Sequence, residues 1–186
     1  MIDRLLRFWV YGGALCGLLL AAITPVLARG WPLGLLAVWL QLPLYMLHQY
    51  EEHDDNRFAE FVNRHMAHGR RALTPASVFL INVPGVWGVV AVSWMLAATV
   101  RPGLGLIAID LTLVNALAHI GGLIMLRVYN PGVITAVIGF IPIGGWALWC
   151  VQRTRPSLAD HALGIGIALA IHIAIVIFVR RRASAP

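Results

Sequence analysis

Six apolar runs of about 20 residues each constrain this chain more than any other feature. A helix of about 20 residues crosses the roughly 30 Å hydrocarbon core of a bilayer. The runs fall at about 9–28, 31–50, 77–99, 104–128, 132–151 and 161–179, and short turns rich in proline, glycine and arginine separate most of them. We therefore predict an all-α, polytopic integral membrane bundle with six transmembrane helices, forming a single domain over residues 1–186.

Composition and charge exclude several other classes of protein. Apolar residues make up 60% of the chain and charged residues 12%, which excludes an ordinary water-soluble globule. The 14 cationic residues are all arginines, scattered over short loops, so we expect no nucleic-acid partner. Cys16 and Cys150 each lie in an apolar run, which argues against a disulfide framework or a cysteine metal motif. Arg4 and Arg7 precede the first run as in a secretory signal, but its length of about 20 residues predicts an uncleaved span.

The arginines also predict which way the spans point. With six spans, ten arginines fall on one side of the membrane and four on the other. The ten are Arg4, Arg7, Arg57, Arg64, Arg70, Arg71, Arg127, Arg180, Arg181 and Arg182. Because cytoplasmic loops carry the excess of positive charge, we predict a multi-pass protein of the bacterial inner membrane with both termini in the cytoplasm.

The one long loop, residues 51–76, contains a segment of a different kind. Over about 54–70, one helical face carries Phe58, Phe61, Val62, His65 and Met66. The opposite face carries Arg57, Glu60, Arg64 and Arg71. This pattern predicts an amphipathic helix on the cytoplasmic membrane surface. A solvated linker helix is the alternative, and a lid over a nearby site is the sharper hypothesis.

The candidate chemistry begins at the end of the second run, where the sequence reads HQYEE. On a helix, Glu51 and Glu52 lie three and four residues after His48 and share its face. An imidazole and carboxylates suit a divalent metal, zinc first, with iron or manganese as alternatives. By analogy with the inverted zinc motif HxxEH, His48 and Glu52 would bind the metal and Glu51 would be the general base. The alternative is that both acids pair with Arg57 or another arginine.

The fourth run supplies a further candidate ligand, His119, with Asn115 four residues before it. Both share a face with Thr112 and Gly122, and such a stripe of small and polar residues faces protein rather than lipid. At about 1.5 Å per residue, His119 and His48 lie about 22 Å and 26 Å from the outer face. We therefore expect them in one layer near the cytoplasmic edge.

Other polar groups in the spans are weaker candidates. His53 follows the motif directly, and His65 would complete a coordination shell if the amphipathic segment were a lid. His172 lies near the membrane midplane, as a further ligand or as a core histidine. Asn82 is expected mainly to form a hydrogen bond between helices, and Asp110 lies too far toward the outer face to belong to this site.

Three short motifs together, HQYEE at 48–52, NALAH at 115–119 and YNPG at 129–132, resemble the HXXEE-domain family of bacterial integral membrane proteins. The resemblance covers roughly residues 35–150. It singles out eight positions: His48, Glu51, Glu52, Asn115, His119, Tyr129, Pro131 and Gly132. The family is functionally uncharacterised and has been suggested to contain metal-dependent membrane hydrolases. We expect Tyr129 to donate a hydrogen bond to a substrate oxygen, or to be an interfacial aromatic residue, and Asn130 to cap the fifth span.

These observations lead to one leading prediction and two alternatives. The first is a metal-dependent hydrolase of a lipophilic substrate, with metal ligands His48, Glu52 and His119 and with Glu51, Asn115 and Tyr129 as catalytic residues. The second is a cyclase, isomerase or other proton-transfer enzyme on an isoprenoid-like substrate, working through the same carboxylates. The third is a metal or proton transporter, or a haem protein with His119 and His172 as axial ligands. The expected partners are this substrate and membrane lipids, and Gly13 and Gly17 form a GxxxG pair that leaves a homo-oligomer open.

Overall fold

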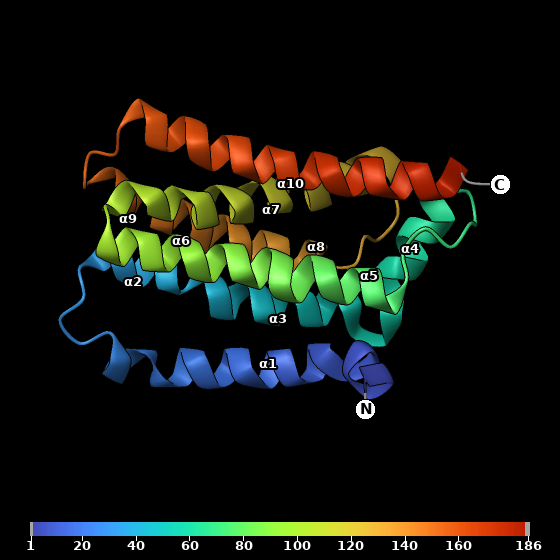
Figure 1. Ribbon diagram of the computed structural model, residues 1–186, viewed down its shortest axis with the longest axis horizontal. Coiled ribbons are helices and arrows are strands. Elements are labelled where there is room, and N and C mark those ends of the chain that lie inside the picture. Colours follow the sequence, from blue (N-terminus) through green and yellow to red (C-terminus); the bar gives the residue numbers. More distant parts are fainter. Residues whose placement is uncertain (1, 185–186) are drawn as a thin grey trace.

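The computed structural model describes residues 2–184, and within that range it contains helices and no strand (Figure 1). The α-helices are α1 (Ile2–Leu27), α2 (Leu33–Trp39), α3 (Gln41–His53), α4 (Arg57–His65), α5 (Pro75–Leu80), α6 (Gly88–Thr99), α7 (Leu106–Leu126), α8 (Val133–Thr135), α9 (Ile141–Gln152) and α10 (Leu158–Ser184). A π-helical segment, Ile81–Trp87, joins α5 to α6, and another, Ala136–Phe140, joins α8 to α9. The predicted all-α class is therefore confirmed.

Five helical stretches are long and apolar enough to cross a membrane: Ile2–Leu27, Pro75–Thr99, Pro102–Leu126, Val133–Gln152 and Leu158–Ser184. The remaining predicted span, 31–50, is divided at Leu40 into α2 and α3. Trp39 is the last residue of α2, and Pro43 lies four residues after it. Because proline has no N–H, the carbonyl of Trp39 receives no helical hydrogen bond from residue 43, which is the physical reason for a break here. The count of six spans stays a prediction.

The outer surface of the bundle is apolar, as a lipid-facing surface must be. Leu15 and Leu19 on α1 are 69% and 60% exposed, and Ile138 between α8 and α9 is 69% exposed. A water-soluble protein rarely exposes so many large apolar side chains together. The interior is filled by residues such as Tyr45, Phe140, Leu106, Ile109 and Leu111, all under 2% exposed.

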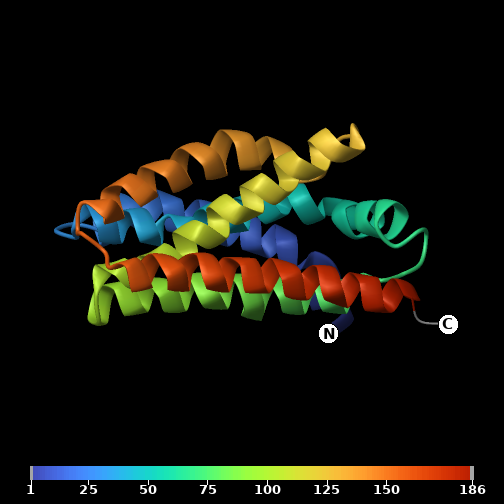
Figure 2. The same cartoon turned by 90° about the horizontal axis from the view of Figure 1, so that it is seen from above.

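The start of α1 and the end of α10 lie at the same end of the bundle, which we call the termini end (Figure 1). Helix α1 packs along α3, and α10 packs along α7. Helix α4 lies at the termini end, beyond the last turn of α3 (Figure 2). The predicted HQYEE motif, at the end of α3, is therefore at this end of the bundle.

Helix α4 is shorter than the helix predicted at 54–70. Asp55 and Asn56 have positive φ angles before it, and it ends at His65. Its buried face is formed by Ala59 and Val62, whereas His65 is exposed. The cluster that covers this face joins residues of α1, the 66–74 connection, α5 and α10: Trp9, Val10, Ala67, Ala72, Leu73, Val78 and Val179. Helix α4 is thus packed on the bundle, and its place at a membrane surface stays a prediction.

The GxxxG pair of α1 provides a test of this packing. A methyl group at Gly17 would lie 2.9 Å from Met46 Cβ and 3.1 Å from the Pro43 carbonyl, whereas one at Gly12 would meet nothing within 4 Å. We expect Gly17→Leu to destabilise the protein by about 1–3 kcal/mol through overpacking, which lowers its melting temperature by several degrees. Gly12→Leu, the matched control, should leave it unchanged. Tryptophan fluorescence during thermal unfolding in detergent measures both, and equal melting temperatures would contradict this α1–α3 interface.

Candidate metal centre

Three of the predicted ligands come together at the termini end of the bundle. His48 and Glu52 extend from α3 and His119 from α7, and one ligand atom from each lies within 4.8 Å of the other two. All three are buried, with exposed fractions of 0%, 6% and 4%. Among the residues that the structure describes, this is the one group of three or more such side chains close enough to hold a metal ion.

A hydroxyl group next to Nδ1 of the His48 ring fixes the orientation of this ring. Its Nδ1 lies 2.8 Å from Thr135 Oγ1, and the same hydroxyl donates to Glu51 Oε2 at 2.5 Å. A hydroxyl has one proton. Because that proton points to Glu51, the Nδ1 of His48 must carry the proton of the neutral ring and donate it to Thr135. The Nε2 atom of His48 is left as a bare lone pair, buried and without a hydrogen-bond partner.

His119 is oriented in the same way, by an amide. Asn130 Nδ2 donates to the backbone carbonyl of His119 at 3.1 Å, which leaves Asn130 Oδ1 facing His119 Nδ1 at 3.3 Å. An oxygen can only accept, so Nδ1 carries a proton and donates it to Asn130, and Nε2 is the ring atom that is directed toward Glu52. Gly122 on α7 makes room for this arrangement, since a methyl group there would lie 2.7 Å from Asn130 Nδ2.

Two imidazole Nε2 atoms therefore face the carboxylate of Glu52, and that of His48 has no hydrogen-bond partner. His48 Nε2 lies 3.6 Å from Glu52 Oε2, and His119 Nε2 lies 3.5 Å from Glu52 Oε1. Burying such groups unpaired is costly. A cation among them removes the cost, and histidine ligands of metals characteristically donate their other ring N–H to a neighbouring acceptor. The donor set suits zinc, iron or manganese.

Glu51 has a different environment from the one expected of a general base. Its Oε1 accepts hydrogen bonds from Tyr129 Oη at 2.8 Å and from the backbone N–H of Ile134 at 3.1 Å. Its Oε2 accepts from the backbone N–H of Thr135 at 2.7 Å as well as from its hydroxyl. Glu51 thus caps the N-terminus of α8, where free N–H groups favour a carboxylate. Both oxygens are engaged.

The hydroxyl of Tyr129 is engaged as well, since it donates to Glu51. Partial burial of the ring, together with this hydrogen bond and the charge of Glu51, raises the pKa of the Tyr129 hydroxyl above its ordinary value. The phenol therefore stays protonated at neutral pH and remains a donor. In this structure the acceptor is Glu51; a hydrogen bond from Tyr129 to a substrate oxygen, or a place among interfacial aromatic residues, stays a prediction.

A second chain of hydrogen bonds reaches the cluster from the other side. Trp87 Nε1, which can only donate, donates to Gln49 Oε1 at 2.5 Å, and Gln49 Nε2 donates to Asn82 Oδ1 at 2.7 Å. Asn82 Nδ2 then lies 3.0 Å from His53 Nε2, which is itself 3.2 Å from Glu52 Oε2. Asn82 thus joins helices, as expected. His53 is a buried neighbour of the cluster.

A glycine in the 127–132 loop allows the two ligand imidazoles to be covered by backbone. Gly132 has a φ of +97°, a conformation that side chains disfavour. A methyl group on it would lie 2.7 Å from His119 Cε1 and 2.9 Å from His48 Cε1. Gly132 is also the residue before the first turn of α8. Asn130, which we expected to cap this span, binds His119 instead.

Two aromatic rings pack beside the imidazoles of the cluster. The Phe140 ring lies 4.1 Å from the His48 ring, centroid to centroid. Phe58 of α4 lies 5.5 Å from His53 and 5.9 Å from His119. Helix α4 therefore places one apolar ring, that of Phe58, beside the cluster. This contact supports the hypothesis that the amphipathic segment covers the site.

The remaining predicted site residues lie apart from this group. His65 is exposed on α4 and packs against Phe61 at 4.8 Å. His172 is half-buried, with Nδ1 2.8 Å from the Ala168 carbonyl of its own helix. Asn115 lies one turn before His119, and its Oδ1 is buried without a hydrogen-bond partner.

Two charged groups near or outside the site differ in their surroundings, since Arg57 has a carboxylate partner whereas Asp110 Oδ2 is buried without a hydrogen-bond partner. Arg57 pairs with Asp54, three residues before it, rather than with Glu51 or Glu52. Asp110, which we placed outside the site, packs close to Gly164 of α10.

Comparison with known families adds one finding. A family described as "protein of unknown function with HXXEE motif" matches residues 39–147, more than half of the chain. This protein belongs to the HXXEE family. Searches of curated proteins and of solved structures found no match.

Two important residues of this HXXEE protein were missed by sequence reasoning. Thr135 and Phe58 carry no motif of their own, although a hydroxyl three residues after Gly132 in an apolar run was a signal available in the sequence. Thr135 contacts the cluster because Glu51, on α3, caps α8. That contact joins residues 84 positions apart.

Removal of the Thr135 hydroxyl tests this network. In Thr135→Val, the buried Nδ1–H of His48 loses its acceptor and Glu51 loses a donor, so we expect a loss of about 1–3 kcal/mol in the free energy of unfolding. Thr99→Val is the control, because the Thr99 hydroxyl is exposed and only donates to the carbonyl of Met95. Its effect should stay within about 0.5 kcal/mol. Thermal unfolding in detergent measures both variants, and similar melting temperatures would exclude the network.

Proposed function

We propose that this HXXEE protein is a membrane metalloenzyme that holds one divalent ion with His48, Glu52 and His119 and hydrolyses a lipophilic substrate. One observation carries the proposal: two imidazole Nε2 atoms face the buried carboxylate of Glu52, and that of His48 has no hydrogen-bond partner. An excess proton or a metal ion would satisfy these groups. We favour the metal because both imidazoles are held by their Nδ1 atoms in the tautomer that binds metals.

Zinc is the first choice of ion, with iron or manganese as alternatives. Two imidazoles and one carboxylate are a common ligand set of catalytic zinc, which keeps a fourth position open for water or substrate. A bound divalent ion would supply Lewis acidity. It would also lower the pKa of water, so that a nucleophile forms near neutral pH. Hydrolysis of an ester, amide or phosphoester bond is the chemistry that this equipment favours.

The chain's own residues then have distinct roles. Glu51 is a positioning residue, because four hydrogen bonds occupy its oxygens and tie α3 to the start of α8. We assign proton transfer to Glu52 and His53, whose nearest atoms lie 3.2 Å apart. Phe58 and Phe140 limit the access of bulk water from two sides. This assignment replaces our expectation that Glu51 is the general base.

We place this site at the cytoplasmic edge of the bacterial inner membrane. The metal ligands lie at the termini end of the bundle. The excess of arginines on the side of the termini favours a cytoplasmic location for that end. Five helices that can span a bilayer surround the site with hydrocarbon, which gives lateral access to a lipophilic substrate.

Metal content tests the ligand set. Purified wild-type protein should carry about one equivalent of zinc or iron, or take it up on loading. Glu52→Gln, which keeps the shape of the side chain, and His119→Ala should each lose at least about tenfold in affinity, since three ligands are the minimum for this kind of site. His172→Ala is the control and should retain the metal. A wild-type protein that can be loaded with no divalent ion would contradict the proposal.

Isotope incorporation tests the reaction. The metal-loaded protein is incubated with mixed micelles of bacterial membrane lipids in water enriched in heavy oxygen, and products are identified by mass spectrometry. We expect label in one product of the cleaved bond with wild type, and none with Glu52→Gln or after chelation. Cleavage products without label, or equal labelling by Glu52→Gln, would overturn the hydrolase assignment.

A further inference from the structure

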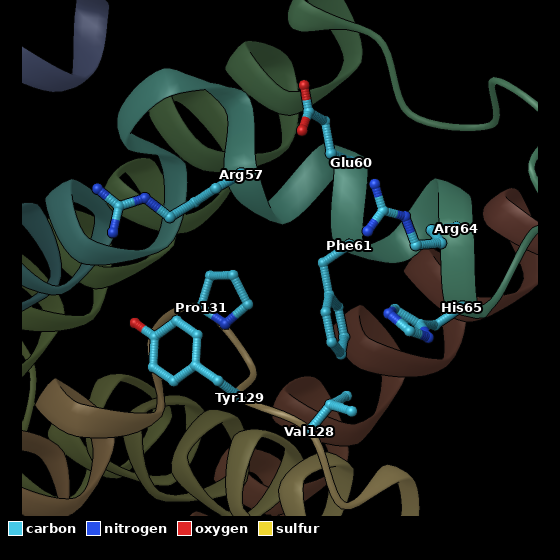
Figure 3. A pocket seen from close by; sticks show the side chains of 8 residues that line it. All are labelled: Arg57, Glu60, Phe61, Arg64, His65, Val128, Tyr129 and Pro131. Atoms are coloured by element: carbon cyan, nitrogen blue, oxygen red, sulfur yellow. The ribbon is translucent and has the colours of Figure 1, made fainter.

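A pocket of about 210 Å³ lies between α4 and the 127–132 loop, separate from the metal ligands (Figure 3). Its apolar surface is formed by Phe61 of α4 and by Val128, Tyr129 and Pro131 of the loop. Arg57, Arg64 and His65 stand around it on α4. The pocket thus combines an apolar floor with a basic rim.

Arg64 is the cation of this rim that is available to a ligand. Among residues 2–184, Arg64 has no carboxylate within salt-bridge distance, whereas Arg57 pairs with Asp54. Glu60, on the same helix, is exposed and is directed away from Tyr129 and Pro131 (Figure 3). His65 lies beside Arg64 and adds N–H groups at the same edge. A guanidinium group with an unoccupied fork of donors is a good receptor for phosphate.

The pocket and the candidate metal centre share the 127–132 loop. Pro131 lines the pocket, and the next residue, Gly132, packs against the imidazoles of His48 and His119. Tyr129 lines the pocket with its ring and donates its hydroxyl to Glu51. A molecule held in the pocket is therefore separated from the metal ligands by a single layer of chain.

An apolar strip runs away from the pocket along the end of α7. Ile124 and Met125 are 68% and 83% exposed, and Leu126 and Val128 are 40% and 39% exposed. Val128 also lines the pocket, so this exposed apolar stretch of chain begins at the pocket floor. An acyl chain fits such a strip, because it would cover apolar side chains that nothing else in the described chain covers.

We propose that this pocket binds the phosphate headgroup of an anionic amphiphile, with Arg64 and His65 on the phosphate and the acyl chain along the end of α7. This deepens the proposed function and rests on it, because it identifies that amphiphile as the class of substrate cleaved at the metal centre. The headgroup is held beside the 127–132 loop, whose Gly132 packs against the imidazoles of His48 and His119.

Binding of a fluorescent phosphatidic acid in mixed micelles tests the pocket directly. We expect Arg64→Gln to weaken binding about tenfold, the loss of one charge-assisted contact. Arg64→Lys should recover part of it. Arg4→Gln, which removes the same charge at the same end of the bundle but outside the pocket, should change it by less than about twofold. Both positions, Arg64 and Arg4, are exposed, and equal binding by Arg64→Gln and wild type would overturn the inference.

Competition distinguishes the possible sources of the phosphate. Short-chain phosphatidic acid should displace the probe, whereas phosphatidylcholine and inorganic phosphate should be at least about tenfold weaker. If inorganic phosphate displaces the probe equally well, the ligand is a free anion, and the substrate class proposed here is wrong.

The inference and the proposed function fail separately. Glu52→Gln should keep the affinity for phosphatidic acid while it loses the metal. If wild type binds phosphatidic acid but no metal, the metalloenzyme proposal fails, and with it the substrate role of the lipid. If metal-dependent hydrolysis occurs and proceeds equally well in Arg64→Gln, the metal centre stands and the headgroup site fails.

Discussion

The arrangement of this protein depends on one constraint: the carboxylate of Glu52 is buried against the Nε2 atoms of His48 and His119. Each imidazole is held at its Nδ1 atom by a partner on another segment, Thr135 for His48 and Asn130 for His119. Gly132 lets the loop backbone lie against both rings. Because low-polarity surroundings make unpaired polar groups expensive, this arrangement favours a cation at the centre of the group.

The two π-helical segments contain residues that contact the site. The π-helical segment that contains Pro84 also contains Asn82, which reaches His53 through its amide. The second π-helical segment ends with Phe140, whose ring covers His48, and Pro142 follows it. Prolines and π-bulges remove backbone hydrogen bonds, and they recur at functional sites for this reason. In this chain both π-helical segments adjoin the buried polar network.

Periodicity and spacing in the sequence predicted the helical class and the residues of the cluster. The role of Glu51 and the length of α4 depend on tertiary contacts and backbone angles. The helical class and the convergence of His48, Glu52 and His119 follow from apolar runs and from four-residue spacing, which are local properties. The role of Glu51 could not be predicted, because it depends on Thr135 and Ile134, which lie more than 80 positions away. The length of α4 depends on positive φ angles that the sequence pattern did not indicate.

Zinc K-edge X-ray absorption of protein loaded with one equivalent of zinc tests the central claim most directly. The account predicts a first shell of nitrogen and oxygen at about 2.0–2.2 Å with outer-shell scattering from two imidazoles, reduced to one in His119→Ala. A zinc environment without imidazole scattering, or one that is identical in wild type and His119→Ala, would contradict it.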